Sequence, residues 1–95
     1  MALITGAQLR AARGLTNLSI LQLSEMTGLS INTIKRAEGT NLEVPVNAAN
    51  ARALRSALER LGVAFLEPSG DEGHGVRFSS GEPPAFAPRR RPVHD

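Results

Sequence analysis

Two short segments with helical periodicity flank Gly28, and this arrangement constrains the fold more than any other feature of the 95-residue sequence. Ser19 precedes the first segment and Ser30 the second, and serine is a favoured N-cap because its hydroxyl accepts a free N–H of the first turn. Gly28 tolerates the positive φ that a tight turn requires. The sequence therefore predicts one helix that follows Ser19 and is broken at Gly28, and another over Ile31–Glu38.

The side chains of these two segments separate into an inward and an outward set. Residues three, four and seven apart lie on the same face of a helix. On this spacing the inward face of the first helix is predicted to carry Ile20, Leu23, Ser24 and Thr27. The inward face of the second is predicted to carry Ile31, Ile34 and Ala37. The outward face of the second helix carries Asn32, Thr33, Lys35 and Arg36. Polar side chains of these types can hydrogen-bond to base edges in duplex DNA.

Capping residues predict a helix over Gly6–Thr16 at the start of the chain. Thr5 and Gln8 have the spacing of a capping box, in which each residue bonds to the backbone N–H of the other. Asn17 can end this helix because asparagine tolerates the left-handed region. Its inward residues are predicted to be Leu9, Ala12 and either Leu15 or Thr16.

A fourth and longer helix is predicted from about Asn47 to Leu61, after a loop over Thr40–Val46. Asn47 is its expected N-cap, and Gly62 is well placed to stop it. Its apolar stripe is predicted to consist of Ala51, Leu54, Leu58 and Leu61.

The sequence changes character after Gly62. Val63–Glu67 and Gly75–Phe78 have the composition of two short strands joined by a turn, and an isolated hairpin is marginally stable in water. We therefore expect this hairpin to pack on the fourth helix or on a second subunit. Residues 79–95 are rich in proline and predict a disordered or extended tail. The expected organisation is a mainly α domain over 1–62, a hairpin extension over 63–78 and the tail.

Composition and charge exclude several classes of protein. The chain has no Cys, Trp or Tyr, which excludes disulfides and thiol catalysis and leaves Leu, Ile, Val and Ala to build the core. No stretch approaches the roughly 20 apolar residues of a membrane span, and the N-terminus does not resemble a secretion signal. A cytoplasmic location is therefore expected. Residues 1–62 carry seven Lys or Arg against four Asp or Glu, a bias that permits DNA binding without requiring it.

These motifs resemble the lambda-repressor-like (XRE/Cro-type) helix-turn-helix family. The resemblance covers about Gln8 to Leu61 and rests on QLRAAR near the start, on S-x-x-x-L-S-x-x-x-G-L-S from Ser19 to Ser30, and on TIKRAEG from Thr33 to Gly39. It implies a helix-turn-helix bundle of about four helices whose third helix reads the major groove of double-stranded DNA.

The resemblance also implies roles for individual residues. It places Ser30, Ile31, Asn32 and Arg36 nearest the bases, and Thr33 and Lys35 at phosphates or neighbouring base edges. For Lys35 and Arg36 the alternative is a solvated helix face. Arg13 and Glu38 are expected to form a buried ion pair between the first and third helices, and Arg10 to lie at the surface or face a phosphate.

Two positions depart from the family pattern. Ile20 stands where the family usually has a glutamine that touches a phosphate, so we expect Ile20 to pack and Ser19 or Asn17 to replace that contact. Ser24 stands where a small alanine is usual, at the close crossing of the two motif helices. This change is harmless if the hydroxyl bonds back to its own helix.

Other polar clusters are weaker candidates. Asp71 and Glu72 lie beside His74 in a glycine-rich turn and are interpreted as turn formers. Neither His74 nor His94 has partners at metal-ligand spacing, so no metal is expected. The sequence has no Cys, no paired carboxylates on a framework, no phosphate-binding glycine loop and no catalytic triad, so no cofactor or enzymatic activity is expected either. The run Arg89–Arg91 either enters a minor groove or is a solvated stretch of the tail.

The leading hypothesis is therefore a bacterial or phage transcriptional regulator, in the first instance a repressor, that acts at the nucleoid. We expect it to bind an inverted repeat as a homodimer, because one recognition helix covers only a few base pairs. The fourth helix and residues 63–78 are the candidate dimer interface. The alternative is an antitoxin or phage-type protein with the same fold that binds a protein partner through 63–78.

Overall fold

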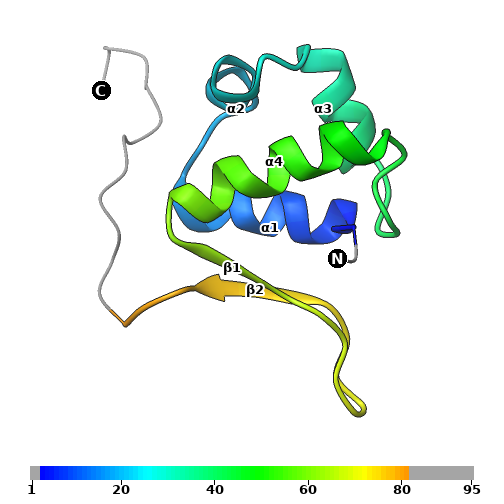
Figure 1. Cartoon of the computed structure of the whole chain (residues 1–95), viewed down its shortest axis with the longest axis vertical. Coiled ribbons are helices and arrows are strands. Elements are labelled where there is room, and N and C mark those ends of the chain that lie inside the picture. Colours follow the sequence, from blue (N-terminus) through cyan, green and yellow to red (C-terminus); the bar gives the residue numbers. More distant parts are fainter. Residues whose placement is uncertain (1–2, 82–95) are drawn as a thin grey trace, which may run out of the picture.

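The computed structural model describes residues 3–81, which form four helices followed by a two-stranded antiparallel sheet. α1 and α4 pack together across the middle of the molecule, with α2 and α3 on one side and the hairpin on the other (Figure 1). The predicted mainly helical fold with a short hairpin is confirmed. The elements are α1 Gly6–Thr16, α2 Ile20–Thr27, α3 Ile31–Glu38, α4 Ala48–Arg60, β1 Val63–Leu66 and β2 Gly75–Phe78.

The helices begin where the sequence predicts, because each start depends on local hydrogen bonds. The backbone N–H of Gln8 donates to Thr5 Oγ1 at 3.0 Å, and the N–H of Thr5 donates to Gln8 Oε1 at 2.9 Å. Ser19 and Gln22 form the same reciprocal pair at the start of α2. Single caps begin the other two helices: Ser30 accepts from the N–H of Thr33, and Asn47 from the N–H of Asn50.

The helix ends follow the predicted stop signals, with one difference. Asn17 (φ 55°) and Gly28 (φ 77°) end α1 and α2 in the left-handed region. Gly39 ends α3 without a positive φ. Leu61 is the C-cap of α4 rather than its last residue, and Gly62 then takes φ 94°.

The core consists of aliphatic side chains from all four helices and the first strand. Thr16, not Leu15, is the fully buried residue at the end of α1, and its hydroxyl donates to the carbonyl of Ala12 at 2.9 Å. This bond satisfies the only polar atom of the threonine side chain, which makes its burial tolerable. The largest fully buried hydrophobic side chains are Ile4, Leu9, Leu23, Ile34, Leu54, Leu58 and Val63.

The hairpin packs one face against α1 and α4. Val63 pairs with Phe78 and Phe65 with Val76, and these four side chains face the helices. The guanidinium of Arg55 on α4 lies 5.5 Å from the centre of the Phe65 ring, within the range of a cation–π contact. The expectation that the hairpin packs on the fourth helix is confirmed, and α1 provides a second support.

Gln8 joins the hairpin to α1 through contacts that sequence periodicity does not indicate. Its side-chain amide donates to the carbonyl of Leu66 at 3.0 Å and to that of Gly75 at 2.9 Å. The first strand ends at Leu66, one residue before the predicted Glu67. Gln8 thus completes the capping box of α1 and also holds together Leu66 and Gly75, the last residue pair of the hairpin before its turn.

The loop between α3 and α4 is held against the start of the chain. The N–H of Gly6 donates to the carbonyl of Leu42 at 2.9 Å, and the N–H of Val44 donates to the carbonyl of Ile4 at 3.1 Å. These bonds fix the predicted loop next to the N-terminal end of α1.

Most of the predicted tail is outside the part of the chain that the structure describes. Ser79–Gly81 belong to the described residues, and the N–H of Ser79 donates to the carbonyl of Gly62 at 2.7 Å. Arg89–Arg91 and His94 lie outside them, so their predicted roles stay predictions. Within residues 3–81, no helix is both long enough and apolar enough to cross a membrane.

Candidate nucleic-acid interface

The turn between α2 and α3 is fixed by side chains on both of its sides. The N–H of Gly28 donates to the carbonyl of Ser24 at 2.8 Å, which closes α2. The hydroxyl of Thr27 bonds the carbonyl of Leu23 at 2.8 Å and accepts the N–H of Leu29 at 3.2 Å. The direction in which α3 leaves α2 is therefore set by a network of hydrogen bonds rather than by Gly28 alone.

Ser24 contributes to this network in an unexpected way. Its hydroxyl donates to the carbonyl of Leu29 at 2.6 Å, across the turn, and not back to its own helix. The hydroxyl does not bond back to its own helix, the condition expected for a harmless serine, because the carbonyl of Leu29 comes within reach of position 24. A serine at the helix crossing thus ties the two helices together where an alanine makes no hydrogen bond.

α3 has two chemically different faces. Ile34 and Ala37 are fully buried, and Glu38 is 8% exposed. On the opposite side Asn32, Lys35 and Arg36 are all exposed. These three polar side chains offer amide, ammonium and guanidinium donors from one short helix.

Ile31 does not pack inward as predicted and is 38% exposed. At 100° per residue it lies about 60° from Ile34 and about 40° from Lys35 around the helix axis, so it stands at the boundary between the two faces. Its exposed part is available for an apolar contact, such as a thymine methyl group.

The two hydroxyls at the start of α3 bond to each other. Ser30 Oγ lies 2.9 Å from Thr33 Oγ1 and also accepts the N–H of Thr33 at 3.1 Å. Ser30 is exposed and Thr33 half-buried. Either hydroxyl can still bond to a further group on the outside, because an O–H can both donate and accept.

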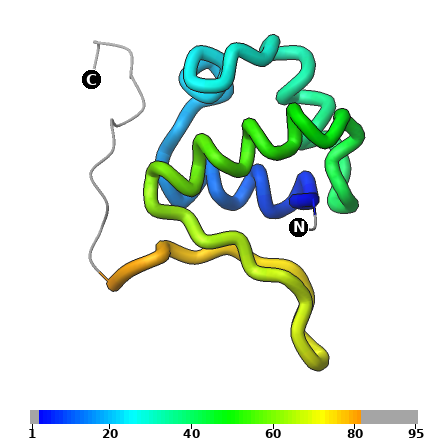
Figure 2. Tube along the Cα trace, viewed as in Figure 1, coloured from blue at the N-terminus to red at the C-terminus, as the bar shows by residue number. Residues whose placement is uncertain are grey.

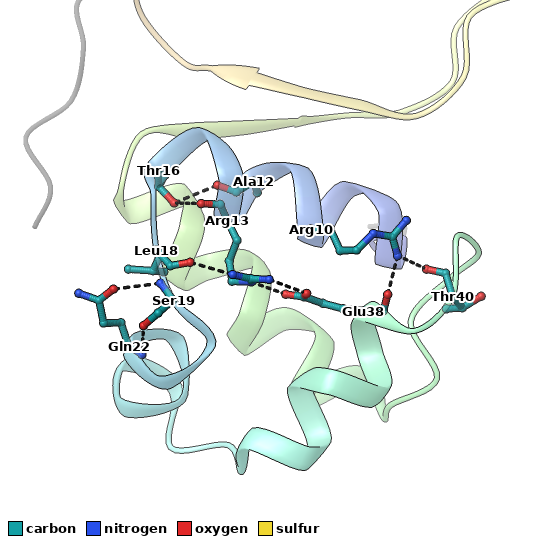
Figure 3. Close-up of polar contacts among 9 residues, drawn as sticks. All are labelled: Arg10, Ala12, Arg13, Thr16, Leu18, Ser19, Gln22, Glu38 and Thr40. Carbon is teal, nitrogen blue, oxygen red and sulfur yellow. Dashed lines mark hydrogen bonds and ion pairs between the residues drawn. The ribbon is translucent and has the colours of Figure 1, made fainter. Parts of the chain in front are cut away.

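Ser19 lies at the start of α2, where its hydroxyl accepts the N–H of Gln22 at 3.0 Å (Figure 3). It is half-buried and keeps a donor that can reach an outside acceptor. Ile20 is partly buried and packs on the core, as predicted.

Arg10 is exposed, in agreement with one of its two predicted alternatives, a place at the surface. Its guanidinium donates to the carbonyls of Glu38 and Thr40 (Figure 3). It also donates to the side chain of Asn41. Carbonyls at the end of a helix have no partner within that helix, so an arginine nearby satisfies them. Arg10 thus holds the end of α3 and the loop that follows it, and its contact with a phosphate stays a prediction.

Arg13 and Glu38 form the expected ion pair between α1 and α3. Nε of Arg13 lies 2.6 Å from Oε2 of Glu38 and Nη2 lies 2.9 Å from Oε1, a two-point geometry, while Nη1 donates to the carbonyl of Leu18 (Figure 3). Hydrogen bonding to Glu38 raises the pKa of Arg13 above its usual value, burial acts in the opposite direction, and the charge of Glu38 raises it further. Arg13 therefore stays charged, and its two-point contact with Glu38 fixes the rotation of α3 relative to α1.

The acidic residues of the hairpin lie away from α3. Glu67, Asp71 and Glu72 are exposed around a turn that projects from the far side of α1 and α4 (Figure 1). The interpretation of the turn as structural agrees with its backbone, since Ser69 and Glu72 exchange two hydrogen bonds of 2.9 Å. The exposed face of α3 is thus not covered by the molecule's own hairpin.

No cluster with metal-binding composition occurs in residues 3–81. His74 lines a shallow cavity of about 420 Å³ between α1 and the hairpin, together with Gln8 and Asn41. All four hydrogen-bonding positions of the Gln8 amide face partners within the molecule, so Gln8 is not available to a ligand there.

Comparison with known proteins adds no assignment. No protein-family model matches the chain, and no curated protein sequence matches it significantly. A functional conclusion therefore depends on the geometry of α2 and α3.

Proposed function

We propose that this chain is a sequence-specific regulator of transcription, in the first instance a repressor, that binds double-stranded DNA. In this proposal α2 and α3 form a lambda-repressor-like helix-turn-helix, and α3 enters the major groove. The observation that carries the proposal is the exposure of Asn32, Lys35 and Arg36 on the face opposite the buried Ile34 and Ala37. A regulator of this kind acts at the nucleoid, where the DNA is.

The chemistry of this face suits base recognition. The major groove admits one α-helix, and its base edges present distinct patterns of donors and acceptors. Asn32 can make two hydrogen bonds to adenine, and Arg36 can make two to guanine. Lys35 can neutralise a phosphate, and the capping hydroxyl of Ser30 can hydrogen-bond to a base edge.

Selection of bound sequences from random DNA, followed by alanine variants, tests direct readout. Asn32→Ala and Arg36→Ala are each expected to lower discrimination at one defined base position by about 1–3 kcal/mol, because each removes a two-point contact. Arg77→Ala, which removes an exposed arginine of the hairpin, is the matched control and is expected to leave base preference unchanged. Equal weakening on every sequence would place both side chains on phosphates and contradict the readout.

We further propose that two copies of the chain bind an inverted repeat and meet through the hairpin and α4. Leu66 is 37% exposed on the outer face of the hairpin, the face turned away from α1 and α4. Among the described residues β2 pairs only with β1, so one edge of the strand is open to a partner strand.

Sedimentation equilibrium over the micromolar range tests this assembly. The unmodified chain is expected to be a dimer, and Leu66→Glu is expected to weaken the dimer at least about tenfold, because it places a charge in an apolar interface. Leu42→Glu is the matched control, since Leu42 is 75% exposed in the α3–α4 loop and outside the proposed interface. A monomer that binds its DNA site tightly would contradict the dimer.

The same open surface of the hairpin supports a second candidate function. In it the chain is an antitoxin or phage-type protein that binds a different protein. That function predicts a stable complex through residues 63–78 that Leu66→Glu disrupts. It is favoured over homodimerisation if the isolated chain sediments as a monomer.

A further inference from the structure

A groove of about 310 Å³ lies between α2 and the end of α4 and has no role in the proposed function. Its lining is mainly apolar, with Leu18, Met26 and Leu61 beside Gln22 and Glu25. Met26 is 37% exposed, whereas Leu18 is 3% exposed. Within residues 3–81, no ion pair includes Glu25. The groove thus offers apolar surface with one negative charge beside it.

The chain passes next to this groove after the second strand. β2 runs toward the side of the molecule at which α4 ends (Figure 2), and the N–H of Ser79 donates to the carbonyl of Gly62, the neighbour of Leu61. Ser79 is thus held beside Leu61, which lines the groove. Phe86 follows Ser79 by seven residues, which span up to about 25 Å when extended, so the chain is long enough for Phe86 to reach the groove.

We propose that residues 82–91 of the same chain occupy the groove, with Phe86 against Met26 and Leu18 and with Arg89–Arg91 facing Glu25. An aromatic ring buries a large apolar area, and a methionine sulfur makes favourable contacts with it. The basic run begins three residues after Phe86, which lets the arginines reach the negative charge beside the groove.

Two further features favour this segment over a separate molecule. Its attachment to the chain makes docking an intramolecular event, with an effective concentration that a short linker sets at about the millimolar level. Pro83, Pro84 and Pro88 restrict the backbone on both sides of Phe86, so that less conformational entropy is lost on docking. The inference does not depend on DNA binding.

A spin label attached to the full-length chain tests the docking. The sequence contains no cysteine, so Pro92→Cys creates a single site for a nitroxide just beyond the arginine run. Paramagnetic broadening of amide signals is expected to concentrate on Gln22, Glu25 and Met26 and to be weak at Gly73 in the hairpin turn. Broadening that is absent or evenly distributed would overturn the proposal.

Variants of the same labelled chain identify the contacts responsible. Phe86→Ser is expected to lower the ratio of docked to undocked chains by on the order of tenfold, because it removes the main apolar contact. Ala85→Ser is the matched control and is expected to retain the broadening. Equal broadening in the Phe86→Ser variant would contradict docking through Phe86.

A mixed sample separates docking within one chain from docking between two. In it, isotope-labelled chains without a nitroxide are combined with spin-labelled chains at natural abundance. No broadening at Met26 is expected in the isotope-labelled chains. Broadening there would mean that the segment of a second copy occupies the groove, which would overturn the intramolecular proposal.

Discussion

Glu38→Gln is expected to lower the free energy of unfolding by about 3–5 kcal/mol, because it leaves the largely buried guanidinium of Arg13 without its counter-charge. The carboxylate is 8% exposed and accepts two hydrogen bonds from Arg13. A glutamine of nearly the same size retains only one acceptor atom and no charge. Urea denaturation followed by far-UV circular dichroism measures the change, with the slope m as a check on two-state behaviour.

The second ion pair of the described residues supplies a matched control. Arg55 and Glu59 lie one turn apart on α4 with a separation of 2.9 Å, but Glu59 is 42% exposed. Glu59→Gln is expected to cost less than about 1 kcal/mol, because water screens the carboxylate end of this pair. Arg55, which is 15% exposed, also keeps its contact with the Phe65 ring. Equal effects of Glu38→Gln and Glu59→Gln would contradict the importance of burial at Glu38.

A double variant separates the charge from the packing. Arg13→Met combined with Glu38→Leu removes both charges and replaces them with apolar groups of similar size. It is expected to be more stable than Glu38→Gln, because no unpaired charge stays buried. If the double variant is as unstable as the single one, the pair acts through its shape and hydrogen bonds to Leu18 rather than through its charge.

Gly6→Ala is expected to destabilise the fold by about 3 kcal/mol or more through overpacking. A Cβ atom at this position would lie 2.0 Å from the carbonyl oxygen of Thr40 and 2.6 Å from that of Ala37. Both are backbone atoms, so neither can rotate away as a side chain can. The close approach exists because the N–H of Gly6 bonds to the loop at Leu42, which brings α1 against the end of α3.

Gly14 in the same helix provides the control, with the opposite sign. No atom lies within 4 Å of a Cβ built at Gly14. Gly14→Ala is therefore expected to stabilise the protein by up to about 1 kcal/mol, because alanine loses less backbone entropy in a helix. Thermal unfolding of the two variants measures both effects. A stable Gly6→Ala variant would show that the loop can move away from α1 at little cost.

The residues of the candidate interface could be named from the sequence, but their surroundings could not. Periodicity placed Asn32 and Arg36 outward on α3, and both are exposed. Periodicity predicted Ile31 to be buried, but it is 38% exposed. Ile31 lies at the edge of the helix face, where burial depends on which other elements pack nearby. Periodicity also gave no indication of the acceptors of Arg10, which are 28 to 31 residues away in the chain. The role of Asn32 and Arg36 in base recognition stays a proposal.

Local signals in the sequence are enough to place the starts of the four helices and the ends of α1 and α2. Thr5, Ser19, Ser30 and Asn47 bond to backbone groups three residues away, and Asn17 and Gly28 adopt the left-handed region by their own conformational preferences. Interactions over such short separations are visible in the order of residues. The clamp of Gln8 on the hairpin and the contact of Gly6 with the loop after α3 depend instead on how the chain folds. Those contacts join residues 31 to 67 positions apart, and they exist because burial of one shared aliphatic core brings distant segments together.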